Sequence, residues 1–444
     1  MIKAFASRHK AWSRLLSIKP HLRRGSWATV EAVVAPALGI ALSPWLLHKL
    51  GAEGFGQWAL ALTIAGFAHL ASLGAGVATM YAAAARSAKD EDAEVADCIK
   101  AGFAVALIAC IGLVFFAWLA AEPIATTLFS KMGQPRTVAV VLLLGVVGLA
   151  LQELDAVFAG ALRGMQRYDS VALLELVGRP IWALSIAIVA YQTHDVLAVL
   201  TVHLVYNLLK VIVRARIAAA LLQRSCFGLP RSLQSMLDIV QFGKWISVQS
   251  LGGVLFSTMD KVLVGWFFGS ADLARYSICL QVAQFVHGLQ ASGLQVITPW
   301  VTRNQSVWSP NIVKKKLMQI CVYLGLGSLI LPLLLLGGSW QLLALWLGAS
   351  FADSNVNLLR VLLAGAAILA FTVPAHYVLL GLGRAKFSAI LLLIAGMASL
   401  LASISLAAFG LMAFALGRIT YGAIACFYLV PIRRFQMRSL SHDA

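Results

Sequence analysis

The sequence predicts an all-α integral membrane protein in which about 12 transmembrane helices form two parallel-repeat six-helix bundles around a central cavity. The first observation is composition: of 444 residues, 60% are hydrophobic and 12% are charged, whereas soluble domains carry about 25% charged residues. The second is a set of runs without Asp, Glu, Lys or Arg at 101–121, 317–352 and 387–417. Because a bilayer crossing needs about 20 apolar residues, each run holds at least one span. The third observation is an internal repeat.

The hydropathy pattern predicts twelve spans, at 25–47, 55–80, 101–121, 137–162, 170–191, 196–216, 242–268, 272–299, 317–337, 355–380, 387–408 and 411–431. Twenty-seven Lys and Arg residues then fall on one side of the membrane and three on the other, with Lys210 and Arg214 counted in the larger group. Basic loops stay in the cytoplasm, so both termini are expected there. The net charge of +17 therefore reflects topology and attraction to anionic membrane lipids, and no nucleic-acid partner is expected.

The repeat is visible in two pairs of segments at nearly the same displacement. "LGAEGFGQWALAL" (50–62) resembles "FGSADLARYSICL" (268–280), and "LRGMQR" (162–167) resembles "LLGLGR" (379–384). The displacement of 217 to 218 residues carries the first span to the seventh and the fourth to the tenth. Six spans are an even number, so both halves have the same orientation, as in transporters built from parallel repeats.

These observations divide the chain into five parts. We expect a cytoplasmic amphipathic N-terminal segment at 1–24, an N-terminal six-helix lobe at 25–225 and a cytoplasmic linker at 226–240. A C-terminal six-helix lobe at 241–432 and a cytoplasmic tail at 433–444 complete the division. No predicted periplasmic loop has room for a folded catalytic domain.

Charged residues inside the predicted spans are the candidates for function, because each costs about 2.5–3.5 kcal/mol at a helix centre. They are Glu31, Glu153, Asp155, Glu175, Arg179, Asp260, Lys261 and Arg418. Glu31, Glu175 and Asp155 are candidates for ion coupling. Glu175 and Arg179 are four residues apart and share a helix face, so an ion pair that neutralises itself is the structural alternative. Asp155 could equally satisfy a nearby basic group.

Asp260 and Lys261 are adjacent and point about 100° apart on a helix, so they do not pair with each other. An aqueous cavity lined by this part of the seventh span explains both charges. A structural ion pair between helices is the alternative. A second set of cations, Arg163, Arg167 and Arg384, lies where the fourth and tenth spans reach the cytoplasm. Arginine binds phosphate oxygens with two parallel hydrogen bonds, so these residues are predicted to capture a pyrophosphate head group.

Several kinds of chemistry are disfavoured by what the sequence lacks. The six cysteines are scattered, and neither a CxxC pair nor a Cys/His cluster with zinc spacing occurs. The phosphate loop of ATPases is also absent. We therefore expect no metal, no cofactor and no catalytic residue.

Four segments resemble the Wzx-type polysaccharide and O-antigen flippases of the multidrug/oligosaccharidyl-lipid/polysaccharide exporter superfamily. They are "LLHKLGAEGFGQWALALTIAGF" (46–67), "LRGMQRYDSVALLELVGR" (162–179), "FGKWISVQSLGGVLFSTMDKVLVGWFFGSADLARYSI" (242–278) and "LLGLGRAKFSAI" (379–390). The resemblance implies a multi-pass protein of the bacterial cell inner membrane that moves an undecaprenyl-pyrophosphate-linked oligosaccharide between leaflets. It implies a cavity between two lobes, lined by Glu31, Asp260, Lys261 and Arg275, with Arg179 as a further candidate.

The resemblance also implies a role in surface polysaccharide biosynthesis, covering lipopolysaccharide, O-antigen or exopolysaccharide. Polysaccharide polymerase and chain-length components are then expected partners. Two alternatives stay open. One is a multidrug or cation exporter of the same superfamily, which would favour an acidic, aromatic pocket. The other is a membrane glycan polymerase or ligase, which would need a catalytic cluster.

Overall fold

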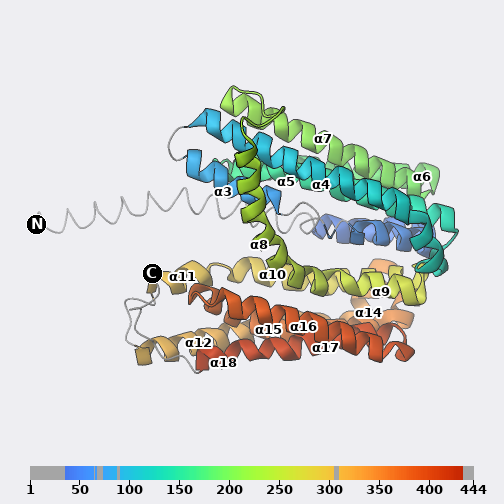
Figure 1. Ribbon diagram of the computed structural model, residues 1–444. Helices are drawn as coiled ribbons and strands as arrows, with labels where there is room; N and C mark the ends of the chain where they lie inside the picture. Colours follow the sequence, from blue (N-terminus) through green and yellow to red (C-terminus); the bar gives the residue numbers. More distant parts are fainter. Residues whose placement is uncertain (1–35, 65, 68–73, 88–90, 305–309, 434–444) are drawn as a thin grey trace, which may run out of the picture.

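The computed structural model describes residues 36–64, 66–67, 74–87, 91–304 and 310–433, and every regular element in these ranges is helical (Figure 1). Eight helical segments are long and apolar enough to cross a bilayer: Asp92–Thr127, Pro135–Gly164, Tyr168–Thr193, Val196–Leu222, Lys315–Gly337, Ala349–Gly381, Ala385–Ser405 and Leu411–Arg433. Each of the eight overlaps one span expected from hydropathy. The predicted class, an all-α membrane protein, is confirmed.

The first half of the chain forms one lobe, which lies at the top of Figure 1. Its described elements are the helical residues 36–64, α3 (Ala75–Ser87), α4 (Asp92–Thr127), the short η1 (Ser130–Met132), α5 (Pro135–Gly164), α6 (Tyr168–Thr193) and α7 (Val196–Leu222). Helix α5 is central, because it packs against α3, α4 and α7.

The second half forms the lower lobe. Its elements are α8 (Leu233–Ser257), α9 (Met259–Phe268), α10 (Ser270–Leu294), α11 (Ile297–Asn304), α12 (Pro310–Ser328), α13 (Ile330–Gly337), α14 (Ser339–Leu347), α15 (Ala349–Gly381), α16 (Ala385–Ser405), η2 (Ala407–Phe409), α17 (Leu411–Ala425), η3 (Cys426–Tyr428) and α18 (Leu429–Arg433). Helix α15 is central here, in contact with α10, α12 and α17.

The repeat read from the sequence recurs in the backbone. Gly51 and Gly269, which correspond at a displacement of 218, both have positive φ, at 71° and 89°. Gln166 and Gly383, which correspond at 217, also have positive φ, at 61° and 74°. A positive φ just after a helix is a common way to end it. Both lobes therefore turn the chain at the same two places.

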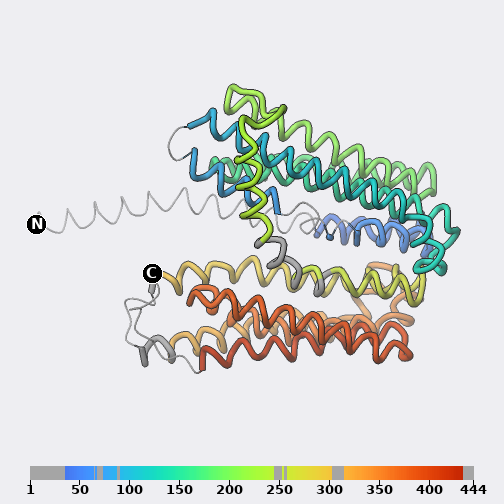
Figure 2. The backbone as a smooth tube through the Cα atoms, in the orientation of Figure 1, coloured from blue at the N-terminus to red at the C-terminus, as the bar shows by residue number. Residues whose placement is uncertain are grey.

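Helix α8 joins the lobes and begins earlier than the sequence predicts. Its N-cap is Ser232, whose side chain accepts a hydrogen bond from the backbone of Ser235, a standard way to start a helix. The expected linker, 226–240, is therefore partly helical. Asp97 of α4 accepts hydrogen bonds from the backbone N–H of Arg231 and from Ser235 Oγ. The backbone tube shows α8 running from the upper lobe to the lower one (Figure 2).

The predicted seventh span is not one helix. It breaks at Thr258, where φ is −133° and ψ is −41°, and so divides into α8 and α9. A Cβ added to Gly66 of the upper lobe would lie 2.7 Å from Thr258 Oγ1. The break therefore coincides with a close approach between the lobes.

The two lobes meet at the end of the molecule that the sequence predicts to be periplasmic. One apolar core there combines Leu60, Met132 and Val138 of the upper lobe with Leu273 and Tyr276 of the lower one. Lys131 Nζ donates a hydrogen bond to the carbonyl of Phe267 at 2.9 Å. At Gly56 the backbones are so close that an added Cβ would overlap the carbonyl of Ser270. This packing closes that end of the molecule.

Candidate functional site

A polar cavity of about 670 Å³ lies within the upper lobe. Helices α5, α6 and α7 form its walls, together with Pro36, Gly39 and Leu62 of the helical residues 36–64 and with Gly66 beyond them. The titratable side chains that line it are Glu153, Asp155, Arg163, Glu175, Arg179, His203, Tyr206, Lys210 and Arg214.

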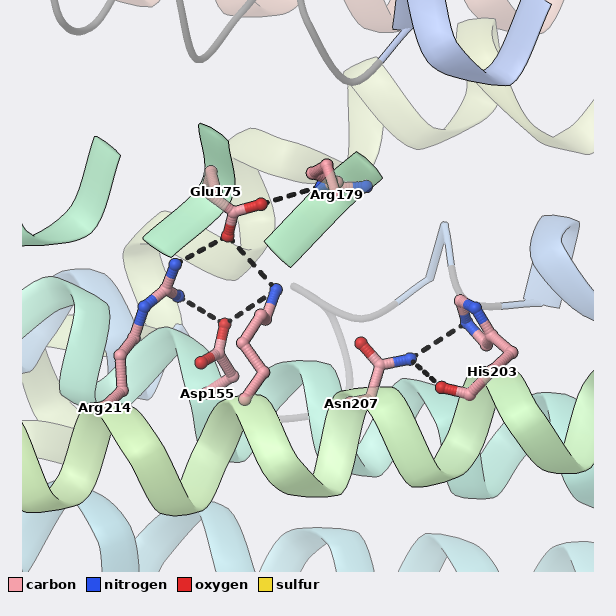
Figure 3. A network of polar contacts seen from close by, with 7 residues as sticks. Asp155, Glu175, Arg179, His203, Asn207 and Arg214 are labelled. Atoms are coloured by element: carbon pink, nitrogen blue, oxygen red, sulfur yellow. Dashed lines mark hydrogen bonds and ion pairs between the residues drawn. The ribbon is translucent and has the colours of Figure 1, made fainter. Parts of the chain in front are cut away.

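Five of these residues form one network of ion pairs (Figure 3). Arg214 of α7 contacts Asp155 of α5 and Glu175 of α6, the latter at 2.6 Å. The Lys210 ammonium lies 3.0 Å from Asp155 and 3.3 Å from Glu175. Arg179 donates from Nε to the second oxygen of Glu175 at 2.7 Å. Three transmembrane helices are thus held together by two carboxylates and three cations.

The network has one more cation than anions and retains unused hydrogen-bonding groups. Asp155 Oδ1, Arg214 Nε and Tyr206 Oη are buried without a partner among the described residues. Arg179 uses only Nε, and its side chain is 32% exposed while those of Lys210 and Arg214 are 9% and 3% exposed. Buried polar groups are normally satisfied. Water or a ligand in the cavity would supply the hydrogen-bond partners that these atoms lack.

The sequence predicted Asp155, Glu175 and Arg179 as candidates but missed Lys210 and Arg214. Both had been counted among cytoplasmic loop cations. The structure corrects this, because α7 continues to Leu222 and buries both side chains. The sequence did contain a signal. His203, Asn207, Lys210 and Arg214 follow one another at intervals of four, three and four residues, which places them on one helix face.

Histidine and asparagine extend this polar face away from the ion pairs. Asn207 donates a hydrogen bond to the His203 backbone carbonyl and contacts the imidazole, both at 3.0 Å. Trp182 Nε1 donates to the other ring nitrogen of His203 at 3.0 Å. His203 is thus held in place by its neighbours.

The upper-lobe cavity meets a groove between the lobes. This groove, of about 280 Å³, is lined by Pro36, Gly39 and Ile40 of the first helical stretch and by Gln281, Gln284, Phe285, Gly288 and Leu289 of α10. Pro36 and Gly39 line both spaces. Near the groove, Ser43 donates a hydrogen bond to Gln281 Oε1 at 2.7 Å. Amide side chains therefore flank the route from the lobe interface to the ion-pair network.

Asp260 belongs to a different centre, in the lower lobe. Its carboxylate accepts hydrogen bonds from Tyr276 Oη at 2.6 Å and from Arg418 Nε at 2.8 Å, and Arg418 Nη2 lies 2.7 Å away. Asp260 and Arg418 are 5% and 7% exposed. These contacts are those of the interhelical ion pair, the structural alternative for Asp260. They do not support the expectation that Asp260 itself lines the cavity.

Lys261 differs from its neighbour. It is half-buried, and no described side chain forms a hydrogen bond or ion pair with its ammonium. Its nearest charges, Asp260 and Arg418, already pair with each other. Lys261 therefore brings an uncompensated positive charge into the lower lobe. Its place in a substrate path stays a prediction.

The remaining predicted residues are spread over the molecule. Arg163 lines the upper-lobe cavity. Arg167 and Arg384 are the N-cap residues of α6 and α16, and both are exposed. Arg275 is exposed and lies 3.3 Å from Asp272. Glu31 lies outside the described residues. Within the described ranges, no group of His, Cys, Asp or Glu side chains is placed to hold a metal ion.

The fold of this protein, with its buried polar route, is that of a multi-pass membrane transporter. A family model described as "Polysaccharide biosynthesis protein" matches residues 22–305, and the chain belongs to this family. The predicted resemblance is thereby confirmed.

Two relatives are similar in sequence. The "Putative O-antigen transporter" of Shigella flexneri is 20% identical over 369 residues, covering 82% of this chain and 84% of the relative. The "Uncharacterized membrane protein EpsK" of Bacillus subtilis (strain 168) is 25% identical over 179 residues. That match covers 39% of this chain and spans about a third, 34%, of EpsK.

Solved structures share the fold at low identity. An inward-facing multidrug resistance MATE family transporter of the MOP superfamily matches with a TM-score of 0.70 and 15% identity, covering 91% of this chain and 97% of that one. An outward-facing structure of such a transporter matches with a TM-score of 0.64 and 16% identity, covering 94% and 95%. The comparisons place the chain among transporters rather than enzymes, as the sequence predicts.

Proposed function

We propose that this protein moves an oligosaccharide carried on a polyprenyl pyrophosphate across the bacterial inner membrane, by alternating access, for surface polysaccharide biosynthesis. Family membership and the O-antigen transporter relative support a glycan cargo. The observation that carries the proposal is the cavity in the upper lobe, with its surplus positive charge and its opening toward the lobe interface.

The cavity suits the two parts of such a cargo that are costly to move through hydrocarbon, the sugars and the pyrophosphate. Sugar hydroxyls lose hydrogen bonds in hydrocarbon, at a cost of several kcal/mol each. Gln281, Gln284 and the unpartnered atoms of the network would replace those bonds. The pyrophosphate is anionic, and the free nitrogens of Arg179 are its proposed partner, with Arg163 elsewhere on the lining of the same cavity and Arg167 and Arg384 at the cytoplasmic ends of the helices. The polyprenyl tail would remain in the bilayer.

The charge of the cavity argues against an exporter of organic cations. Of the three carboxylates that line the cavity, Asp155 and Glu175 each contact two or three cations, which leaves them little negative charge for a cationic cargo. We propose that these carboxylates hold the cations in position and release them in part when an anion binds. A role in ion coupling would add to this, because protonation of Glu175 would free Arg179.

Gene deletion and complementation test the cargo. In the deletion strain we expect loss of the surface glycan and accumulation of its lipid-linked unit on the inner leaflet, because the unit cannot reach the polymerase and chain-length components. Wild-type protein and the control variant Arg216→Gln, at an exposed position of α7, should restore the glycan. A deletion strain with normal surface glycan and heightened drug sensitivity would instead support the multidrug alternative.

The closed end of the molecule tests alternating access. Replacement Gly56→Val would place side-chain atoms against the carbonyl of Ser270 and keep the lobes apart, so export should fall below about a tenth of wild type. Gly112→Val is the matched control, because nothing lies within 4 Å of a Cβ added there. Normal export by Gly56→Val would show that this end need not close.

A further inference from the structure

A groove of about 800 Å³ lies on the lower lobe, between α12 and α18. Its α12 wall consists of Lys315, Met318, Gln319, Val322 and Tyr323, and Leu429, Val430 and Arg433 form the opposite wall. The α12 residues are spaced at three, four, seven and eight positions from Lys315, so they share one helix face. The groove is supported by an apolar core that includes the buried residues Leu317, Cys321, Tyr428 and Ile432.

The groove has a charged end and an apolar body. Lys315 lies in the second turn of α12, which begins at Pro310, and α18 ends at Arg433. Both cations line the groove, at the end of the lobe that carries its basic residues. Lys315 to Tyr323 spans about 12 Å along the helix, close to the roughly 15 Å thickness of one hydrocarbon leaflet. Tyr323 and Val430 are exposed at 69% and 37%. The charged end is thus at head-group depth and the apolar walls at acyl-chain depth.

The two cations of this groove lack an acidic partner in the described part of the chain. Neither Lys315 nor Arg433 forms an ion pair with a described residue. The sequence explains why, because it contains no Asp or Glu from 273 to 352 and none from 354 to 442. The same side of the upper lobe is different. Asp92, Glu94 and Asp97 lie there beside its basic residues.

We propose that this groove is a binding site for an anionic phospholipid of the cytoplasmic leaflet, with the phosphate between Lys315 and Arg433 and one acyl chain along Met318, Val322 and Val430. The cytoplasmic leaflet is rich in anionic lipid, which attracts basic residues at the membrane surface. The site is separate from the transport cavity. Figure 1 shows α12 and α18 on the side of the lower lobe that faces away from the upper one.

Lipid retention by the purified protein tests this site. Wild-type protein should retain phosphatidylglycerol in native mass spectrometry far better than phosphatidylcholine with the same acyl chains. Each basic residue near the surface contributes about fivefold, so Lys315→Gln/Arg433→Gln should weaken phosphatidylglycerol retention by about 25-fold. The matched control, Arg216→Gln/Arg224→Gln, removes the same charge from exposed positions of the upper lobe and should leave retention unchanged.

A neutral variant tests the apolar body of the groove. Val430→Trp fills it without changing charge and should lower retention of phosphatidylglycerol while the melting temperature stays near wild type. Equal retention by wild type and Lys315→Gln/Arg433→Gln, or equal loss in the control pair, would overturn the site. So would full retention by Val430→Trp, because the cations would then act without a groove. Displacement of phosphatidylglycerol by polyprenyl phosphate would assign the groove to the cargo lipid instead.

Discussion

The two lobes have the same repeated backbone arrangement but contain different kinds of polar centre. In the upper lobe, two carboxylates and three cations surround a cavity of about 670 Å³. In the lower lobe, Asp260 forms an ion pair with Arg418 and accepts a hydrogen bond from Tyr276, and the cavity that Arg418 lines is about 20 Å³, room for about one water molecule. Both centres join helices, but the upper one also borders a cavity that is large enough for a ligand.

The repeat shows that neither centre has a counterpart in the other lobe. At the displacement of 217 residues, Asp155 corresponds to Thr372, and Glu175 corresponds to Leu392. In the reverse direction, at the displacement of 218 that relates Gly51 to Gly269, Asp260 corresponds to Leu42. The duplicated backbone positions helices in the same way, while each polar centre is particular to its lobe. We infer that cargo binding depends on the upper centre and stability on the lower one.

Among these substitutions, replacing Asp260 should have the largest effect, and we expect that effect on the stability of the protein. Asp260→Asn leaves the Arg418 guanidinium buried without a compensating charge, which costs about 3–5 kcal/mol. We expect a clear drop in the melting temperature of the purified protein and in its amount in the membrane. A variant as stable as wild type would show that the lower pair does not hold the lobe together.

The double variant Asp260→Leu/Arg418→Met separates charge from packing at the same place. Replacing both partners of a buried ion pair by apolar residues is often neutral or stabilising. We therefore expect the double variant to regain the melting temperature and most of the export. A stable double variant without export would give the lower centre a direct part in transport.

Arg179→Gln should reduce export while leaving the fold intact. Lys210 and Arg214 still hold Asp155 and Glu175, so the melting temperature should change little. Loss of one charge-assisted hydrogen bond to the cargo is worth about 1.5–3 kcal/mol, or about tenfold to a hundredfold in export. Arg179→Lys should fall between, because lysine cannot bind phosphate in bidentate fashion. Export at the wild-type rate would remove Arg179 from the cargo site.

Replacing Lys261 should reduce export less than replacing Arg179 does. Lys261→Ala removes a cation without an ion-pair partner, so we expect about a fivefold loss of export, the size of one hydrogen bond's net contribution. Lys261→Arg should be better tolerated because it retains the charge. Quantified surface glycan in the complemented strain measures both. Equal export by Lys261→Ala and wild type would leave Lys261 without a transport role.

Hydropathy and the repeat predicted the class of fold and the turns at Gly51 and Gly269, because these depend on local sequence. The pairing of Asp260 with Arg418 could not be predicted, since 158 residues separate the partners and only the packed lobe brings them together. The break at Thr258 had no Gly or Pro to signal it. Lys210 and Arg214 were missed because basic residues near the end of a hydrophobic run look like loop cations.

Labelling of introduced cysteines tests most directly whether water reaches the upper centre but not the lower one. Gln152 lines the upper cavity and is half-buried, whereas Ser277 is 3% exposed beside the lower pair. With a membrane-impermeant maleimide, Gln152→Cys should react and should be protected by the lipid-linked glycan, while Ser277→Cys should remain unmodified. Labelling of Ser277→Cys at the same rate, or of neither position, would contradict the account.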